Sequence, residues 1–555
     1  MGINISESYD SFRQLRENNA YYVDKTAMIK QYLVDNFKSA VLFARPRRFG
    51  KTLTMTMFRE FLDISQDSRD VFEGLEIMNY KEVVDKFMNK YPVVFLSLKE
   101  IYGKDEDDFK KKYLEVISDL CKQYDYLLKS EKVNAADKEL LESYEYRNNK
   151  NDGSEILGLL ARMLNAHFNK PVFILIDEYD VPMAKTLGTE VYEIARDLVE
   201  HMLSYVCKTN ENVKAVMLSG CLYTVKNSTY TGVNNIVKYT ILSPLYASSI
   251  GFNDDDVKKI LADAGLSDWY DTVKEWYDGY LFGRDSMYCP WDVLSFVGSL
   301  LDDSYSEAMG PENYWVNTSE TSIDIIRGFF GKVNGVTESF ERLLAGETID
   351  CTVNDNLPYH RIHDSGENIW SALLETGYLT KTVKEKMPLM PLKIPNREIK
   401  DVFRQEVWYF FKDKVENSYV TDLASQLWSK NILAAQNNLE KILESTLSFY
   451  HEYHEYSYHL ILDGFFTGLG YRVLSEAESG YGRSDLIILD PARRRGMILE
   501  LKHAEREKEL EKSLKDASTQ IIEKKYDSIL KYQNYETITR YGMAFYDKKA
   551  RIAEV

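Results

Sequence analysis

Apolar segments alternate with longer stretches of helical periodicity along the first half of the chain. The clearest apolar segments are residues 40–43, 91–98, 172–176 and 213–218. Continuous apolar strands separated by helices are typical of a parallel sheet that is covered by helices on both faces. A charged segment with a helical pattern, residues 104–152, interrupts the series and is expected to decorate the sheet as an insertion. The pattern therefore predicts an α/β fold for this part of the chain.

The hydrophobic pattern then changes twice. Residues 251–450 are mostly helical in pattern and are punctuated by glycine and proline. The last hundred or so residues predict a helix over 458–469, three short strands, a long charged helix and a final strand pair. We therefore expect three regions: an α/β domain over 1–250, a helical lid or coupling region over 251–450, and a small α/β domain over 451–555.

Composition limits the class of protein but not its chemistry. The chain has 555 residues, with 44% hydrophobic and 28% charged, as in a globular protein of more than one domain. The net charge of −18 opposes broad attraction to DNA, although a local basic groove is compatible with it. The five cysteines are scattered without a C-x-x-C pair, which favours a reducing cytoplasm. We find neither a signal-peptide core nor an apolar run long enough for a membrane span.

One loop closely matches a phosphate-binding pattern. In "ARPRRFGKTLT", residues 44–54, Gly50, Lys51 and Thr52 fill the last three places of G-x-x-x-x-G-K-[ST], and Arg45 stands at the first glycine. The preceding strand and following helix give the context that such a loop needs, with backbone N–H groups directed at an anion. Lys51 would reach the outer phosphates and the Thr52 hydroxyl would bind magnesium.

A second element of a nucleotide site follows in the expected order. The apolar strand in "VFILIDEYD" ends at Asp177 and Glu178, where the first would hold the metal shell and the second would polarise the attacking water as general base. Arg45, Arg47 and Arg48 are candidates for phosphate contacts, either within the chain or in a neighbouring copy. Together, the two elements predict ATP binding and hydrolysis with magnesium.

A third candidate site lies near the C-terminus, in "SDLIILDPARRRGMILELK". Because side chains alternate along a strand, Glu500 and Lys502 face the same way. An antiparallel hairpin centred near Arg493 would bring Asp485 beside both of them. Two carboxylates and a lysine suit a magnesium ion that activates water, with Lys502 positioning or deprotonating that water. The spacing predicts a metal-dependent phosphodiesterase site.

Several blocks together resemble a known family. The block "YYVDKT" precedes the loop "RPRRFGKT". Five further blocks follow the loop along the chain: "LIDEYDVP", "STYTGVNN", "EWYDGYLFG", "YWVNTS" and "ETGYLT". The chain thereby resembles the predicted AAA-ATPase-like family over most of residues 1–400, and that family's own loop reads R-P-R-R-F-G-K-[ST]. Arg45 is therefore the family's variant of the loop. The chain departs from the family at Cys221, near which an arginine is usual.

The C-terminal block resembles the PD-(D/E)XK nuclease superfamily, in a form that is often fused behind this ATPase-like family. "ESGYGRSD" carries Ser484 where a tyrosine is usual. Glu455 and Glu478 are both candidates for the superfamily's helical acid, and Glu478 is otherwise either a further acidic ligand or a residue that only shapes the turn. The supporting residues that the resemblance implies are Glu478, Arg483 and Gln520.

The combined expectation is a cytoplasmic enzyme that binds and hydrolyses ATP and controls a magnesium-dependent endonuclease, with ATP and Mg²⁺ as cofactors. Nucleic acid, DNA by preference, is the expected partner, in defence or mobile-element biology and without a membrane. Ring assembly is common among AAA proteins, so a homo-oligomer is also expected. The alternative is a nucleotide-dependent switch whose nuclease-like domain binds DNA or a protein partner without cutting. A further alternative is an ATPase-like domain that binds nucleotide only structurally.

Overall fold

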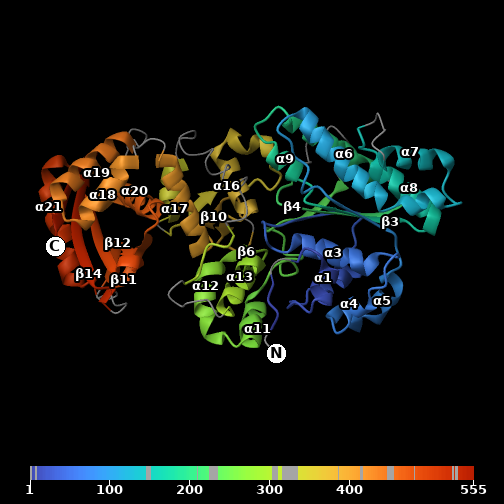
Figure 1. The fold of residues 1–555 in the computed structure, drawn as a ribbon, viewed down its shortest axis with the longest axis horizontal. Helices are drawn as coiled ribbons and strands as arrows, with labels where there is room; N and C mark the ends of the chain where they lie inside the picture. The colour runs from blue at the N-terminus through green and yellow to red at the C-terminus, as the bar shows by residue number, and fades with distance from the viewer. Residues whose placement is uncertain are drawn as a thin grey trace. The chain divides into compact units, whose positions relative to one another are not determined.

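The computed structural model forms two compact units (Figure 1). One unit comprises residues 1–322 and 348–398, and the other comprises residues 323–347 and 399–555. The structure describes residues 3–6, 9–145, 152–208, 210–223, 235–302, 310–315, 336–344, 346–385, 387–412, 417–446, 455–479, 482–527, 530–531 and 535–555.

The first unit is built on a parallel sheet whose strand order is β2-β3-β4-β1-β5. Every adjacent pair in it is parallel. The predicted α/β class is confirmed, and the sheet adds one short strand to the four that were expected. The strands are β1 (Ala40–Ala44), β2 (Val93–Ser97), β3 (Val172–Asp177), β4 (Val213–Gly220) and β5 (Val237–Tyr239).

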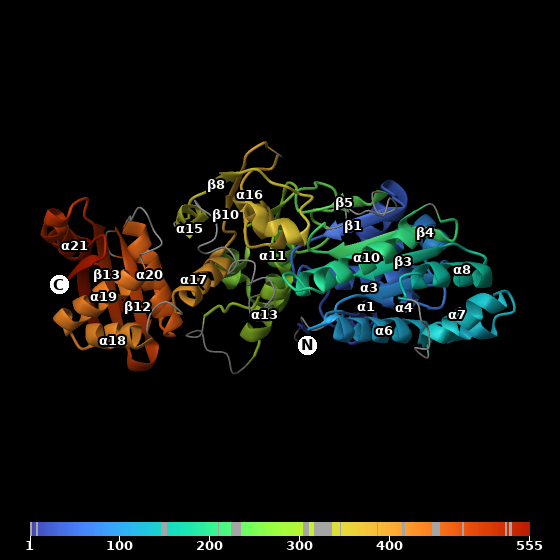
Figure 2. The same ribbon diagram turned by 90° about the horizontal axis from the view of Figure 1, so that it is seen from above.

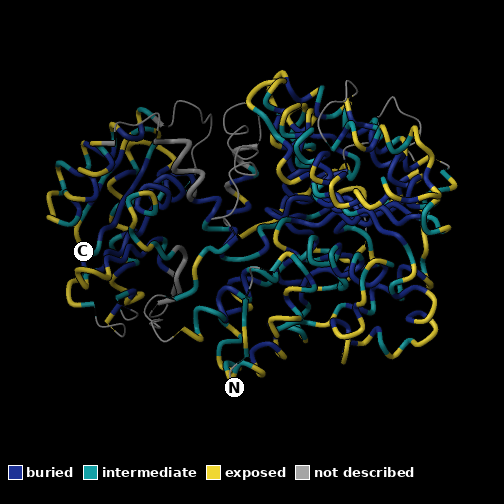
Figure 3. Tube along the Cα trace, turned by 45° about the vertical axis from the view of Figure 1, so that its right-hand side comes forward, coloured by how far each residue is buried: buried dark blue, intermediate teal, exposed yellow. Residues whose placement is uncertain are grey.

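Helices cover both faces of this sheet because its strands are apolar on both sides. Figure 1 shows α3 (Lys51–Leu62) and α1 (Phe12–Glu17) on one face, with α8 (Ile156–Phe168) on the other. The expected insertion is helical and forms α6 (Glu106–Lys122) and α7 (Ala135–Glu145). In Figure 3 the strands form a buried layer and the outer helices carry the exposed positions. The other helices here are α2 (Ala27–Lys30), α4 (Arg69–Phe72), α5 (Lys81–Phe87), α9 (Val181–Lys185) and α10 (Tyr192–Cys207).

The region after residue 250 packs helices around a second apolar core and contains small strand pairings that its mostly helical pattern did not predict. Its first helix, α11 (Asp254–Ala264), begins at a reciprocal capping box of Asn253 and Asp256 and ends at Gly265, whose φ of 72° favours glycine. The other helices are α12 (Tyr270–Tyr277), α13 (Pro290–Leu300) and α16 (Gly366–Thr376). The strands are β6 (Tyr280–Phe282), β7 (Asp285–Met287), β8 (Ile349–Cys351), β9 (Thr380–Lys381) and β10 (Met390–Lys393).

The second unit contains a five-stranded sheet in the order β11-β12-β13-β14-β15, in which only β13 and β14 pair in parallel. Helix α21 covers one face of it through Ile521, which packs with Ile487 and Ile498 (Figure 2). The strands are β11 (Arg472–Ser479), β12 (Gly482–Asp490), β13 (Arg495–His503), β14 (Thr537–Tyr546) and β15 (Lys549–Glu554). The helices are α15 (Val336–Leu344), α18 (Asn417–Trp428), α19 (Ile432–Thr446), α20 (Glu455–Gly468) and α21 (Leu510–Lys524).

Helix α17 (Arg397–Lys412) begins in the first unit and continues, from Ile399, as part of the second. Within the described ranges, no helix has both the length and the apolar character needed to cross a membrane.

Candidate functional site

The predicted phosphate loop joins the end of β1 to the start of α3, as the sequence indicated. Gly50 precedes the first helical residue, Lys51, and has a φ of 88° in the left-handed region. Arg48 also has a positive φ, 66°, which non-glycine residues rarely adopt. Two such residues so close together turn the chain sharply into the helix. The loop is therefore a defined turn at a helix N-terminus, the geometry that suits an anion.

Arg45 lies inside the protein, and its guanidinium is bound to main-chain carbonyls. Its side chain is fully buried. Nη1 donates to the carbonyls of Ala44 at 2.8 Å and Tyr239 at 2.9 Å, and Nη2 donates to that of Tyr246 at 2.8 Å. Burial lowers the pKa of Arg45 to about 10, with an opposing effect from the charge of Glu375. Arg45, which stands where the usual pattern has its first glycine, is thus a buried cation whose hydrogen bonds link the end of β1 to β5. Its side chain does not point at a phosphate position.

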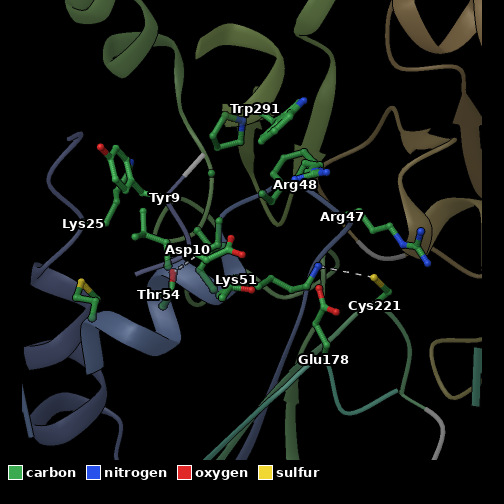
Figure 4. Close-up of a pocket in the computed structure, with 18 of the residues that line it drawn as sticks. Tyr9, Asp10, Lys25, Arg47, Arg48, Lys51, Thr54, Glu178, Cys221 and Trp291 are labelled. Carbon is green, nitrogen blue, oxygen red and sulfur yellow. Dashed lines mark hydrogen bonds between the residues drawn. The ribbon is translucent and has the colours of Figure 1, made fainter. Parts of the chain in front are cut away.

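Lys51 extends its ammonium group back along the loop (Figure 4). Nζ donates to the carbonyls of Arg45 at 3.0 Å and Pro46 at 2.9 Å, and it lies 3.7 Å from the sulfur of Cys221. Burial raises the pKa of the Cys221 thiol, so this residue faces the lysine as a neutral group. An ammonium group held by carbonyl oxygens beside a cavity can exchange them for the oxygens of an anion.

The two halves of the predicted nucleotide site meet at Asp177. Thr52 Oγ1 donates a 2.8 Å hydrogen bond to Asp177 Oδ2, and the Ser219 hydroxyl at the end of β4 donates to Asp177 Oδ1. Burial raises the pKa of Asp177, while both hydroxyl donors oppose the shift. Sequence reasoning missed Ser219. The sequence did contain a signal for it, because Ser219 is a polar residue near the carboxyl end of a predicted parallel strand.

Glu178 adopts a strained conformation directly after β3. Its φ is 52°, and its N–H donates to Ser219 Oγ at 3.2 Å. Burial raises the pKa of its carboxyl group, with the charge of Lys51 opposing the shift. Figure 4 shows Glu178 beside the end of the Lys51 side chain. A left-handed non-glycine residue costs about 1–3 kcal/mol and is commonly found at functional sites.

Lys51, Thr52 and Glu178 line a cavity of about 330 Å³. Arg47 and Arg48 are among the described residues that line it, whereas Arg45 is not. Trp291 lies on the wall of this cavity, and the guanidinium of Arg48 lies 3.9 Å from the centre of its ring. The wall also contains aromatic and aliphatic side chains suited to a flat apolar group, namely Tyr9, Tyr21, Tyr22, Val23, Ile250, Phe252 and Leu294.

The predicted hairpin of the second unit forms with the expected register. Leu486 pairs with Leu499 across β12 and β13, so Asp485 comes to lie beside Glu500. Asp485 Oδ2 accepts a 2.6 Å hydrogen bond from the Leu501 N–H, and Lys502 Nζ lies 3.6 Å from Glu500 Oε1. The structure therefore brings together the three residues that the D…E-x-K spacing singled out.

Glu500 has the properties of a metal ligand. It is fully buried, and its carboxyl group has only weak contacts with the backbone N–H of Asp485 and the ammonium group of Lys502, neither of which is a hydrogen bond of good geometry. Burial, followed by the negative charge of Asp485, raises its pKa to about 8. Burial also raises the pKa of Asp485. Two neighbouring carboxyl groups that are poorly stabilised as anions fit a divalent cation, which supplies the missing positive charge.

Of the two candidates for the helical acid, Glu455 has described contacts with this site. At the start of α20, its Oε1 lies 3.3 Å from Lys502 Nζ and its Oε2 accepts from the His503 N–H at 3.2 Å. Glu478 and Arg483 are register partners on β11 and β12, and their side chains lie outside the described part of the structure.

Gln520, the third supporting residue, lies on α21, and its amide donates to the Tyr526 hydroxyl at 3.0 Å. Burial raises the pKa of Tyr526, and the charges of Glu500 and Asp485 add to this shift.

Comparison with known proteins finds a matching family for each of the two regions that contain these sites. Residues 7–230 match the family described as "Predicted AAA-ATPase", AAA-ATPase-like. Residues 453–555 match the PD-(D/E)XK nuclease superfamily. The chain joins an AAA-ATPase-like domain to a PD-(D/E)XK nuclease superfamily domain. The resemblance noted in the sequence is thereby confirmed for both domains.

The chain is also similar to a whole protein of matching length. This relative, "Uncharacterized protein in vnfD 5'region" of Azotobacter chroococcum mcd 1, is 23% identical over 497 residues. The match covers 86% of this chain and 86% of the relative, so it includes at least part of both the AAA-ATPase-like domain and the nuclease superfamily domain.

Proposed function

We propose that this protein binds and hydrolyses ATP with magnesium in its first unit and that the nucleotide controls a magnesium-dependent endonuclease in its second unit. Nucleic acid, DNA by preference, is the proposed substrate. The two domain types support nucleotide chemistry and nuclease chemistry in general terms. Three points are proposed beyond this support. They are the coupling of ATP hydrolysis to nuclease activity, the identity of the two cofactors, and a setting in defence or mobile-element biology.

The observation that carries the nuclease half is the state of Glu500. A fully buried carboxyl group without a good hydrogen-bond donor is costly to keep in a protein interior. Beside Asp485 and Lys502 it has a chemical use, because a divalent ion held by these carboxylates supplies Lewis-acid activation of a phosphodiester and a bound water. A domain that only bound DNA would have no need of this arrangement.

Within that centre, the side chains of this chain divide the remaining work. The ammonium group of the partly exposed Lys502 lies 3.3 Å from Glu455 and 3.6 Å from Glu500, where it can orient water or stabilise charge on the phosphate. The hydrogen bond from the Leu501 N–H fixes one oxygen of Asp485. Glu455 restrains both Lys502 and the strand that carries it.

In the nucleotide half, the loop and Lys51 would bind the phosphate chain, and the aromatic wall would hold the base. Thr52 and Asp177 are hydrogen-bonded to each other and would share a magnesium ion. Glu178 is the proposed general base: it lies at the cavity with a raised pKa, which improves its ability to take a proton from water.

Calorimetry with separate ligands tests both halves. ATP titrated with magnesium into wild type and Glu500→Gln should give equal affinity, and Lys51→Ala should lose binding by about tenfold or more. Manganese, titrated without nucleotide, should show a site in wild type and Lys51→Ala that Glu500→Gln lacks. Unchanged ATP affinity in Lys51→Ala would refute the nucleotide half. Unchanged manganese binding in Glu500→Gln would refute the metal centre.

A further inference from the structure

The turn that follows β3 and carries Glu178 is tied by side chains to the residues just after β4. The hydroxyl of Tyr179 donates to the carbonyl of Leu222 at 2.5 Å. A single oxygen of Asp180, Oδ2, accepts from the N–H groups of Cys221 at 2.9 Å and of Leu222 at 3.0 Å. The side chains of Tyr179 and Asp180 are both buried. The two residues after Glu178 therefore bind the turn to residues 221–222.

The main chain of the same turn is bound to β4 as well. The N–H of Glu178 donates to Ser219 Oγ at 3.2 Å, and the N–H of Tyr179 donates to the Ser219 carbonyl at 3.0 Å. We call these two hydrogen bonds and the three side-chain bonds above the β4 clamp. A left-handed non-glycine residue persists only where the surrounding structure over-determines it. The β4 clamp supplies that restraint for Glu178, whose φ is 52°.

Gly220 allows the two segments to approach this closely. A Cβ atom at this position would lie 2.7 Å from Asp180 Oδ1 and 2.7 Å from a ring carbon of Tyr179. Both distances are well inside van der Waals contact, and the atoms in the way belong to buried side chains. An added methyl group at Gly220 would therefore push the turn away from β4.

A residue from far along the chain completes this arrangement. Tyr359, which follows Asp180 by 179 positions, donates its hydroxyl to the same Oδ2 atom at 3.0 Å. Tyr359 is buried and lines the cavity at the phosphate loop, as Asp180 and Cys221 do. It belongs to the part of the first unit that comprises residues 348–398, outside the AAA-ATPase-like match of residues 7–230. The β4 clamp therefore depends on a segment that the family match does not include.

We propose that Asp180 and Tyr359 are positioning residues for ATP hydrolysis, which act through the β4 clamp to hold Glu178 in its left-handed conformation at the cavity. The inference rests on the proposed function, which assigns Glu178 as general base, and it deepens that function by naming what fixes the base. Lys51 has separate contacts with the carbonyls of Arg45 and the next residue, so ATP affinity should depend on the clamp much less than the rate does.

Steady-state hydrolysis and ATP calorimetry of the full-length protein separate positioning from binding. Asp180→Ala should lower kcat on the order of 10- to 100-fold, with ATP affinity within about threefold of wild type. Asp180→Asn keeps an acceptor oxygen and should recover most of the rate. Gly220→Ala should lower kcat by about tenfold or more, because it separates the two segments without removing a polar group.

Tyr359→Phe removes one hydroxyl, and kcat should fall about three- to tenfold because the other donors to Asp180 remain. The matched control is Tyr288→Phe. Tyr288 is also buried and donates to an aspartate, Asp254, at 2.9 Å, and neither is among the described residues that line the cavity. This control should hydrolyse ATP at the wild-type rate. An Asp180→Ala protein with wild-type kcat overturns the inference, and so does a loss of ATP affinity that parallels the loss of kcat.

Hydrogen exchange without nucleotide tests the β4 clamp independently of activity. In Asp180→Ala the amides of Cys221 and Leu222 lose their acceptor, and those of Glu178 and Tyr179 should exchange on the order of tenfold faster than in wild type. Unchanged exchange at Glu178 and Tyr179 would show that the clamp does not hold the turn, and would overturn the inference. Faster exchange in a protein that hydrolyses no ATP would refute the proposed ATPase and leave the positioning of Glu178 standing.

Discussion

The hydroxyl of Thr52 donates a 2.8 Å hydrogen bond to Asp177, two residues that lie 125 positions apart in the chain. The contact joins the first turn of α3 to the last residue of β3. Because parallel strands end at one edge of a sheet, residues after two of them can meet although no short-range pattern connects them. Ser219, from the neighbouring strand, binds the other oxygen of the same carboxylate. The result is one oriented acid at the foot of the phosphate loop.

The hydroxyl of Thr52 should be needed for ATP hydrolysis. Thr52→Ala removes a hydroxyl that positions Asp177 and that would itself face magnesium, so ATP hydrolysis should fall about 10- to 100-fold. Thr52→Ser keeps the hydroxyl and should retain most of the rate. Phosphate release at saturating magnesium measures both variants. Equal rates in Thr52→Ala and wild type would show that the hydroxyl takes no part.

Arg45 should matter for stability. Its guanidinium satisfies three buried carbonyls, and hydrogen bonds to a charged group are worth about 1.5–3 kcal/mol each. Arg45→Ala should therefore lower the free energy of unfolding of the first unit by about 3 kcal/mol or more. Arg45→Lys, which lacks the planar fork, should recover only part of it. Urea unfolding measures the loss, with exposed Arg284→Ala as control. A change within about 0.5 kcal/mol in Arg45→Ala would contradict the role.

The sequence predicted those parts of the fold that depend on local pattern. The apolar segments 40–43 and 172–176 form most of β1 and β3, and the alternation of Glu500 and Lys502 gives the hairpin register that brings Asp485 to them. These features follow from periodicities of a few residues. The third region was predicted as a helix, strands, a helix and a strand pair, and α20 to β15 have that order.

The remainder depends on contacts between distant segments, which no short motif encodes. Loop spacing could not show that Arg45 turns inward, because its acceptors belong to Tyr239 and Tyr246. Trp291 belongs to none of the motifs in the sequence, and only the fold brings it to the cavity. The choice between Glu455 and Glu478 could not be made from spacing, and a described contact with Lys502 is seen for Glu455.

We expect Glu500 to lower the free energy of unfolding of the protein by an amount that depends on pH. Burial and then the charge of Asp485 raise its pKa from 4.5 to about 8. Ionising such a carboxyl group opposes folding, so the cost grows as pH rises above the unfolded pKa and is fully present above about pH 8. Glu500→Gln should therefore be more stable than wild type by an amount that grows from about pH 5 to about pH 8, reaching on the order of 1–3 kcal/mol.

Thermal unfolding in chelator measures this difference, and the exposed Glu523→Gln on α21 is the matched control. Equal stability of wild type and Glu500→Gln across that pH range would show that Glu500 is well accommodated, and the argument for a metal ligand would fail.

Glu455 should act on cleavage through Lys502. Glu455→Gln removes the charge that faces Lys502 while keeping a side-chain oxygen for the His503 N–H, so the strand should stay in place. We expect cleavage to fall about 10- to 100-fold with manganese affinity changed much less. Single-turnover cleavage alongside metal titration separates the two effects. Loss of metal affinity in parallel with the rate would make Glu455 a ligand instead of a positioning residue.

The most direct test of the account is cleavage of labelled plasmid and single-stranded DNA with magnesium, with and without ATP, by wild type, Asp485→Asn and Lys51→Ala. We predict that wild type cuts in a way that responds to ATP, that Asp485→Asn no longer cuts although it still binds ATP, and that Lys51→Ala cuts without responding to ATP. Magnesium-dependent cutting of equal rate in wild type and Asp485→Asn would contradict the assigned centre. Absence of cutting in every condition, with ATP still bound, would contradict the nuclease and favour a nucleotide-dependent switch.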